Sequence, residues 1–505
     1  MGRTGGWVAA MVLAACGGGG DGEDGTTSGG ATSAGGTTQP TSGPDEPGTS
    51  GAATTAMLST TSTSAGPGET TAGTEGGETG ASEGETGEAT ECADNCHYIR
   101  GGANGGGGDW EDALPALPEV LERGHVYFVA AGDYPGYVFD DPEAGDAEIR
   151  VLRASAADHG TEVGWAAAYA EGEATFGPLA FISGRYAVDG RAAARSVGAF
   201  EGTVVDIAGD AVRFAGFDVD GAFAAQDGLH VGGSCTAMSI AGDDVVVAGN
   251  RIHDAADDGV TIGGVARLAF TGNVVHTLYG CGTDGGCGQC YNGHSDGLEL
   301  FAVVDSEFVG NLIYDMTSTS AVFFGNWADE LGMGPEDYCE NVLLANNILY
   351  SPETGFVAYI EDARGVRLIN NVLWGLHMGA YGGLSIGTHV ADLDMYNNAI
   401  LSINYTHIGG MYDPAEHRGD YNLFAYSLGQ WQDGPHDVVA VDPLFMGISG
   451  GEGPAVDAPT PADFTPQVGS PLRDVGYAGD ADIVVPATDF FGAMRDETPN
   501  LGAIE

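Results

Sequence analysis

The sequence predicts an all-β fold in which short strands wind into a solenoid, and a recurring pattern is the basis of this prediction. In each copy an apolar, alternating run leads to an Asn, and two or three apolar or aromatic residues follow. The Asn residues of the copies are Asn250, Asn273, Asn311, Asn347, Asn371, Asn398 and Asn422. The steps between them are 23, 38, 36, 24, 27 and 24 residues, and the two long steps contain insertions. Within each run the alternation has the two-residue period of a β-strand.

The length of the repeat indicates which solenoid forms. One copy holds short strands that cannot close a core alone, so copies must stack to bury a continuous apolar column. Asn tolerates left-handed backbone angles at a turn, and its amide can bond to the Asn of the next coil. We therefore expect a right-handed parallel β-helix over residues 92–445, with an asparagine ladder along one corner. A propeller is the alternative, but its blades are about 40–50 residues long.

The repeat resembles the right-handed β-helix repeat family of bacterial surface lipoproteins, which includes polysaccharide lyases and hydrolases. The segment "YIRGGANGGGGDWEDALPALPEVLERGHVYF" looks like the N-terminal start of such proteins. It leads us to expect a short capping helix at about Trp110–Arg123. The segments "VDPLF", "GSPLRDVG", "DFFGAMR" and "PNLGAIE" resemble their closing part, which sets a C-terminal segment at residues 446–505.

The N-terminal region predicts export and an anchor. Residues 1–16 have one charge, an apolar run and the ending "LAAC", which resembles a bacterial lipobox with Cys16 as the lipidated residue. The resemblance implies an outer-membrane lipoprotein held at the membrane through the lipid alone. The alternative is a plain secretory signal with a chance cysteine. Residues 17–91 are rich in Gly, Ser, Thr and Glu, so we expect a disordered tether.

The charge balance excludes one class of partner. The formal net charge is −56, and all 16 basic residues are Arg because the sequence contains no Lys. Such a field repels nucleic acid, so no nucleic-acid partner is expected. It is compatible with salty surroundings and with divalent cations.

Three Asp-Gly pairs, each leading into an apolar strand, indicate an acidic corner. They are "QDGLHV" at Asp227, "DDGVTI" at Asp258 and "SDGLEL" at Asp296. Alternation then points His230, Thr261 and Glu299 outward. If the three Asp residues stack about 4.8 Å apart, either one carboxyl keeps a proton or a cation lies between them. Ca²⁺ is the cation that Asp227, Asp258 and Asp296 would bind. The competing explanation is that Asp-Gly only forms turns.

The same corner supplies the candidate catalytic residues, which are Asp227, Asp257, Asp258, Asp296, His294 and Glu299. Paired carboxylates can provide a general acid and a general base. Lyases that use a Lys base are excluded by composition, whereas Arg251 and Arg267 could serve in lyases that use Arg. Asp257-Asp258 and Gly293-His294 are similar to part of the set found in pectin hydrolases, but the later Arg-x-Lys is missing.

Histidines and cysteines leave two alternatives each. His253 and His276 are in register with Tyr314, Tyr350 and Trp374, which favours an aromatic stack over a metal site. Cys281, Cys287 and Cys290 with His294 have zinc-like spacing, but an exported chain favours a disulfide-tied loop, so zinc is not expected. Cys92 and Cys96 are expected to form a small disulfide loop. Seven cysteines remain besides Cys16, so at least one is unpaired or pairs between chains.

Two functions are compatible with these observations. The first is binding, with cleavage, of extracellular polysaccharide or a cell-surface glycan. The acidic corner and aromatic residues taken as exposed (Trp327, Trp374, Tyr279 and Tyr291) favour it. The second is a surface adhesin or structural protein without catalysis, which the lack of a complete catalytic set favours.

Overall fold

The computed structural model describes residues 92, 94–198, 202–226, 229–231, 234–279, 295–317, 319–325, 337–351, 357–375, 383–387, 389–401, 403–404, 417–425, 434–439, 442–448 and 456–505. The predicted signal segment, Cys16 and the whole tether at residues 17–91 lie outside these ranges. Within them, no helix has the length and apolar character that crossing a membrane requires.

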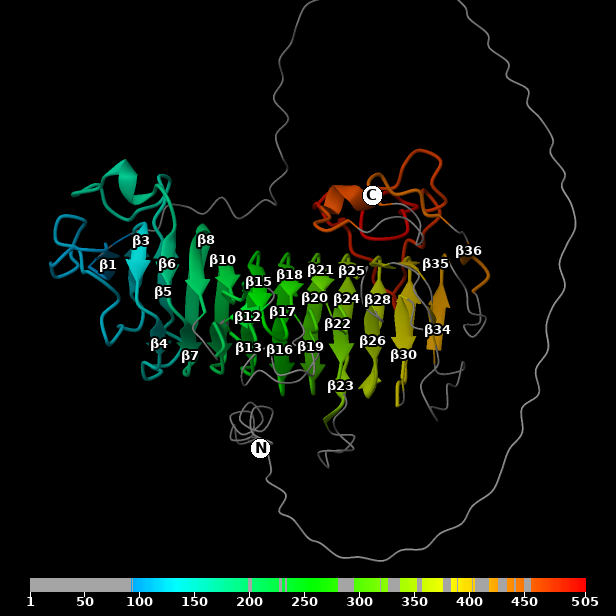
Figure 1. Cartoon of the computed structure of the whole chain (residues 1–505), viewed down its shortest axis with the longest axis horizontal. Coiled ribbons are helices and arrows are strands. Elements are labelled where there is room, and N and C mark those ends of the chain that lie inside the picture. Colours follow the sequence, from blue (N-terminus) through cyan, green and yellow to red (C-terminus); the bar gives the residue numbers. More distant parts are fainter. Residues whose placement is uncertain are drawn as a thin grey trace, which may run out of the picture. The chain divides into compact units, whose positions relative to one another are not determined.

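The described chain forms the predicted right-handed parallel β-helix, with three strands to a full coil (Figure 1). One coil runs from β16 (Val260–Gly263) through β17 (Ala269–Thr271) and β18 (Val274–Leu278) to β19 (Leu298–Phe301). Because β19 pairs in parallel with β16, each coil lies directly on the one before it. We call the three stacks of strands faces one, two and three, in the order of β16, β17 and β18.

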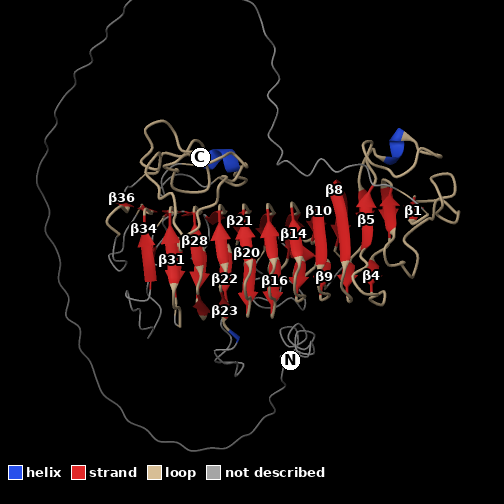
Figure 2. Ribbon diagram, turned by 180° about the vertical axis from the view of Figure 1, so that it is seen from behind, coloured by secondary structure: helices blue, strands red, loops and turns tan. Residues whose placement is uncertain are grey.

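The three faces contain most of the strands, as the ribbon in Figure 2 shows. Face one holds β4 (Tyr137–Phe139), β7 (Leu179–Phe181), β9 (Val205–Ile207), β13 (Met238–Ile240), β16, β19, β22 (Val322–Phe324), β26 (Ala358–Ile360), β30 (Leu384–Ile386) and β33 (Ile403–Asn404). Face two holds β1 (Cys96–Ile99), β2 (Val126–Val129), β5 (Ile149–Arg153), β14 (Val246–Ala248), β17, β20 (Glu307–Val309), β24 (Leu343–Ala345), β28 (Arg367–Ile369), β31 (Leu393–Tyr396) and β34 (His417–Asp420). Face three holds β3 (Gly132–Tyr134), β6 (Ala174–Phe176), β15 (Arg251–Ala255), β18, β21 (Leu312–Met316), β25 (Ile348–Ser351), β29 (Val372–Gly375), β32 (Ala399–Ile400), β35 (Leu423–Phe424) and β36 (Val438–Val439).

Six strands and two short helices complete the described elements. The long strands β8 (Tyr186–Val197) and β10 (Val212–Asp220) span faces two and three and join them into one sheet. Two small pairs lie beside the column, namely β11 (Ala224–Gln226) with β12 (Leu229–Val231), and β23 (Cys339–Glu340) with β27 (Ala363–Arg364). The 3₁₀ helices are η1 (Ala167–Tyr169) and η4 (Pro461–Phe464).

The asparagine ladder predicted from the repeat is confirmed at the corner between faces two and three. Asn371 receives a bond at its side-chain oxygen from the Asn347 amide at 3.0 Å, and its own amide donates to Asn398 at 3.1 Å. The same link joins Asn250, Asn273, Asn311, Asn347, Asn371, Asn398 and Asn422. All seven are buried, so the ladder satisfies polar groups that water cannot reach.

The capping helix expected at about Trp110–Arg123 is wrong. The segment has no helical residue and instead bonds to the free edge of β1. Tyr98 N donates to Gly107 O at 3.1 Å, and Leu114 N donates to Tyr98 O at 2.8 Å. Pro115 and Pro118 also disfavour a helix interior. The segment therefore covers the first coil as an irregular edge strand would, and Trp110 is buried behind it.

The C-terminal segment packs along face three. Leu472, Leu501 and Ile504 join a cluster with Tyr350 and Trp374 of β25 and β29. The segment is drawn in orange and red in Figure 1. Its contacts make this part of face three buried on both sides.

Candidate active site

The predicted acidic corner exists where the chain passes from face three to face one. Gly259 N donates to Asp296 O at 2.9 Å, and Gly297 N donates to Ser320 O at 2.9 Å. These bonds stack Asp258, Asp296 and Ser320 in successive coils. Glycine follows both acids because a Cβ on Gly297 would lie 2.4 Å from Ala321 O.

Side-chain bonds link the corner residues to one another. Asp296 N donates to Asp258 Oδ1 at 2.8 Å, and Ser320 Oγ donates to Asp296 Oδ1. Asp258 is 2% exposed and Asp296 is 3% exposed. Two carboxyl groups are therefore held close together and away from bulk water.

Glu299 completes the group. It points outward from β19, as alternation predicts, and it is 6% exposed. Burial, together with the nearby charges of Asp258 and Asp296, raises its pKa well above the ordinary range, and a hydrogen bond to Asp258 contributes. The protonated form of Glu299 is therefore favoured far more than in an exposed Glu. We call Asp258, Asp296 and Glu299 the carboxyl cluster; it places an acid with a raised pKa beside two further carboxyl groups.

Outward-facing residues extend the carboxyl cluster into a row along face one. Register places Asp206, Ser239, Thr261, Glu299, Phe323, Tyr359 and Ser385 in successive coils. Burial raises the pKa of Asp206, although a hydrogen bond from Ser239 opposes this. On the other side of the cluster, the rings of Phe323 and Tyr359 stack with centroids 5.2 Å apart. The row thus combines acids, hydroxyls and an aromatic pair, the side chains that contact sugars. Sequence reasoning missed this extension, although period-two alternation from Glu299 could have found it.

The prediction that three acids stack in consecutive coils is wrong at its first member. β12, which follows Asp227, pairs antiparallel with β11 in a hairpin beside the column. The strand in register with β16 is instead β13. In the coil before Asp258, the position equivalent to Asp258 is therefore occupied by Thr236. Asp227 itself and His294 lie outside the described residues. Asp257 is buried next to Asp258, and its charge also raises the pKa of Glu299.

The arginines considered as bases are engaged elsewhere. Arg251, on face three, lies 3.4 Å from Asp218, and Arg267 bonds to Asp244 at 2.5 Å. A lyase mechanism with either residue as the base at this corner is therefore not supported.

The stack of His253 and His276 is confirmed, and it carries a polar network that sequence reasoning missed. The two imidazoles lie 5.1 Å apart and parallel, and Tyr314 stacks on His276 at 5.0 Å. Burial alone would lower the pKa of His253, but hydrogen bonds to Asp218 and Asp254 raise it to about 9. Burial and the neighbouring His253 lower the pKa of His276 to about 4. His253 is thus charged and His276 neutral at pH 7.

Two expectations about aromatic and cysteine residues also have outcomes. Trp374 is fully buried, so its expected exposure is wrong, and Tyr279 is half-buried. Trp327 and Tyr291 lie outside the described residues. The Cys92–Cys96 disulfide is confirmed. Cys235 is disulfide-bonded and Cys339 is free and buried, whereas Cys281, Cys287 and Cys290 lie outside the described residues.

A clear hollow of the described surface lies away from the carboxyl cluster. It is on face two, has a volume of about 210 Å³, and is lined by Arg267, Asn341 and Arg367 among others. Its guanidinium groups already bond to Asp244 and Asn341. We assign the site by the chemistry of its side chains, because the acids of the carboxyl cluster are buried whereas Asp305 and Glu307 at the hollow are exposed.

These observations define the class: the chain is a right-handed parallel β-helix protein with a carboxyl cluster on face one. No family profile and no curated protein matches the sequence. Among solved structures it is similar to the pectate lyase Pel9A, at 14% identity over 82% of this chain and 97% of that chain, with a TM-score of 0.44. It is also similar to the Dettilon tailspike protein, at 12% identity over 64% and 62% of the two chains, with a TM-score of 0.37. PfbA, a surface adhesin of Streptococcus pneumoniae, is similar at 11% identity over 67% and 85%, with a TM-score of 0.31. At these identities and scores, none of the three assigns an activity to this chain.

Proposed function

We propose that this protein binds extracellular polysaccharide along face one and cleaves it at the carboxyl cluster. The observation that carries the proposal is the raised pKa of Glu299, which burial and then the charges of Asp258 and Asp296 produce. Pairs of carboxyl groups with separated pKa values divide the roles of acid and base between them. Perturbed pKa values also concentrate at functional sites.

The roles follow from the protonation states. Glu299 donates its proton to the glycosidic oxygen as that bond breaks, and Asp258 or Asp296 accepts a proton from water or from the sugar ring. Phe323 and Tyr359 would support a neighbouring sugar unit against their rings. The row from Asp206 to Ser385 follows the direction in which coils stack, which is the direction that a bound extended chain would take.

The donor set of the corner also fits a hard cation. Asp258, Asp296 and Glu299 offer carboxylate oxygens only, which are the ligands that Ca²⁺ takes. Such an ion would be held by these three residues after Glu299 loses its proton, and it would supply positive charge toward an acidic sugar. Asp227 is left out of this set, because the strand that follows it, β12, is not in register with β16.

Location is part of the same proposal. A lipid on Cys16, followed by the tether of residues 17–91, would hold the β-helix at the outer membrane and within reach of glycans. The "LAAC" ending and the composition of the tether support this arrangement.

A second function has its own support in the burial of the cluster. Asp258, Asp296 and Glu299 are at most 6% exposed, and their bonds to one another are of the kind that hold a turn in place. This favours a surface adhesin or structural β-helix without catalysis.

Incubating the full chain with a panel of neutral and acidic polysaccharides distinguishes the two functions. New reducing ends without an unsaturated product indicate a hydrolase, and absorbance of an unsaturated product indicates a lyase. Binding without either product supports the adhesin. If the chain neither binds a polysaccharide nor releases a product, the proposal is contradicted.

A further inference from the structure

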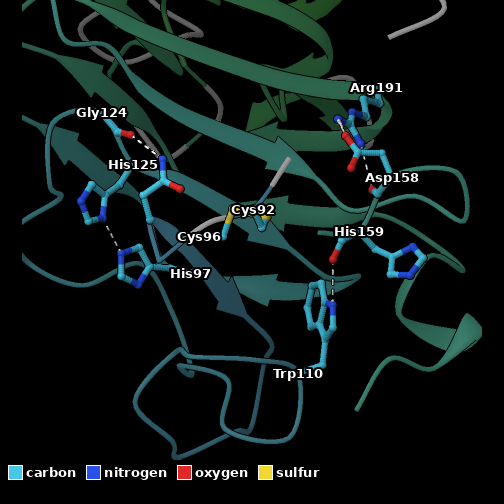
Figure 3. Close-up of a disulfide and its surroundings, with 10 residues drawn as sticks. Cys92, Cys96, His97, Trp110, Gly124, His125, Asp158, His159 and Arg191 are labelled. Atoms are coloured by element: carbon cyan, nitrogen blue, oxygen red, sulfur yellow. Dashed lines mark hydrogen bonds and ion pairs between the residues drawn. A yellow bond between two sulfur atoms is a disulfide. The ribbon is translucent and has the colours of Figure 1, made fainter. Parts of the chain in front are cut away.

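A second group of ligand-type side chains lies at the N-terminal end of the column, far along the chain from the carboxyl cluster. It consists of His97 on β1 and of Glu122 and His125 in the turn before β2. His97 Nε2 lies 2.8 Å from His125 Nδ1, and Glu122 Oε2 lies 3.5 Å from His125 Nε2. One ligand atom from each residue lies within 4.8 Å of those of the other two. Figure 3 shows the two imidazoles directed toward each other, close to the Cys92–Cys96 disulfide.

The fold brings these residues together from separate parts of the chain. The parallel register pairs Cys96 with Val126 and His97 with Tyr127. His97 therefore lies beside the part of the neighbouring chain that begins with His125. Gly124, at φ 81°, makes the turn in which His125 N donates to Glu122 O at 3.2 Å. Asn95 donates its amide to Gly124 O at 3.0 Å and so holds this turn against β1.

The contacts around the group suit metal binding. The His97 ring stacks on Tyr127 at 4.7 Å, which fixes its orientation. The Glu122 carboxylate is 67% exposed and can swing. Asn95 Oδ1 is buried without a hydrogen-bond partner, so an unsatisfied oxygen lies in the same turn contact.

We propose that His97, His125 and Glu122 bind a first-row divalent metal ion of the Zn²⁺ type. Two imidazole nitrogens and one carboxylate oxygen form a ligand set that zinc accepts, with one position left for water. Bonds of about 2.0–2.1 Å in a tetrahedral arrangement need the two nitrogens about 3.3 Å apart, so the 2.8 Å pair has to open only slightly. Nitrogen ligands favour this class of ion over Ca²⁺ or Mg²⁺.

The site would link the first coil to the second. His97 belongs to the terminal strand β1, whereas Glu122 and His125 belong to the turn that starts β2. A metal ion bound by the folded chain only, and not by the unfolded chain, stabilises the fold by mass action. The bond between His97 and His125 is exchanged for two bonds to the metal.

The test uses the full chain after removal of metal by a chelator. Zn²⁺ is titrated in competition with a chromogenic chelator, and thermal unfolding is followed with and without Zn²⁺. We expect His97→Gln and His125→Gln to bind one Zn²⁺ fewer per chain than the wild type, and to lose the rise in the thermal midpoint. Glu122→Gln should weaken this one site by about tenfold or more, since a lost ligand costs at least as much as a lost supporting residue.

His159→Gln is the matched control. His159 and Glu162 form a similar pair, 3.1 Å apart, in the same N-terminal region (His159 is labelled in Figure 3), but no second imidazole joins them. This variant should keep the wild-type number of Zn²⁺ ions. Because the comparison is a difference between variants, zinc bound elsewhere on the chain does not affect it. Equal zinc stoichiometry and equal thermal shifts for the wild type, His97→Gln and His125→Gln would overturn the proposal. If circular dichroism shows that one histidine variant does not fold, the zinc stoichiometry and thermal shift of the other histidine variant and of Glu122→Gln test the proposal.

Discussion

At the scale of single residues, two buried side chains have a raised pKa. Each favours its protonated form over a range of pH in which it would lose the proton in water. Glu299 keeps a proton because burial and the neighbouring carboxyls disfavour its charge. His253 keeps a proton because Asp218 and Asp254 bond to both ring nitrogens, at 2.7 and 2.5 Å. Both states have consequences for stability, because a pKa that differs between folded and unfolded chains makes stability depend on pH.

Glu299→Gln should flatten part of this pH dependence. The folded pKa is raised above the ordinary value of 4.5, so folding is favoured while the acid is neutral. Its contribution is fully present below that value and is lost as pH rises through the raised pKa. Urea unfolding from acid to alkaline pH should therefore show the wild type losing stability relative to Glu299→Gln as pH rises. Glu307→Gln, at an exposed position on β20, is the control and should follow the wild type. Parallel curves for the wild type and Glu299→Gln would mean that Glu299 has no raised pKa.

His253→Gln should show its largest effect at low pH. The folded pKa of about 9 lies above the unfolded 6.5, so the stabilisation is fully present below 6.5 and is lost through about 9. The difference in free energy of unfolding between the wild type and the variant should shrink across that window. His436→Gln removes a more exposed imidazole that bonds to Asp420 at 2.7 Å and is the control. A difference that stays constant with pH would contradict the charged state of His253.

At the scale of elements, the turn between faces two and three is specified by one amide per coil. Each ladder Asn up to Asn398 donates to the next and also to a backbone carbonyl, as Asn371 does to Leu344 O at 2.8 Å. The ladder therefore adds one side-chain link per coil to the register that the buried apolar face already specifies.

Asn371→Ala should lower the free energy of unfolding by about 1–3 kcal/mol, because buried groups of two neighbouring coils lose their partner. Asn341→Ala is the control, since Asn341 is exposed and its side chain bonds to the surface residues Asp305 and Arg367. Chemical denaturation of both variants measures the difference. An unfolding midpoint for Asn371→Ala as high as that of Asn341→Ala would show that the ladder adds nothing to stability.

At the scale of the whole molecule, the sequence alone predicts the architecture and only part of the site. The repeat with its Asn marks the coils, and alternation correctly places Thr261 and Glu299 outward in register. Asp227 misled because the β11–β12 hairpin has the same Asp-Gly signature as a true corner, and no local signal separates the two. The prediction of a helix at about Trp110–Arg123 was wrong because the segment bonds to the edge of β1. This is a tertiary contact, which the local sequence does not show. His97 and His125 are 28 residues apart, so only the register of β1 and β2 shows that they meet.

The anchor is also a property of the whole molecule. Cys16→Ser should release the protein from the outer-membrane fraction, because the lipid is the only proposed attachment and one or two acyl chains supply the membrane affinity. Fractionation of cells that express the wild type or the variant measures this. Cys339→Ser is a suitable control, since Cys339 is free and buried in the column. Outer-membrane retention of Cys16→Ser equal to that of the wild type would contradict the lipoprotein assignment.

The central claim is that the carboxyl cluster cleaves polysaccharide, and the initial cleavage rate of three chains tests it most directly. The wild type, Glu299→Gln and Glu307→Gln are compared on every polysaccharide that the wild type binds. Loss of the neutral acid should reduce the rate by about 10²–10⁴-fold, the usual contribution of a general acid, while Glu307→Gln keeps the wild-type rate. Equal rates for all three chains, or binding without any cleavage by the wild type, would contradict the claim.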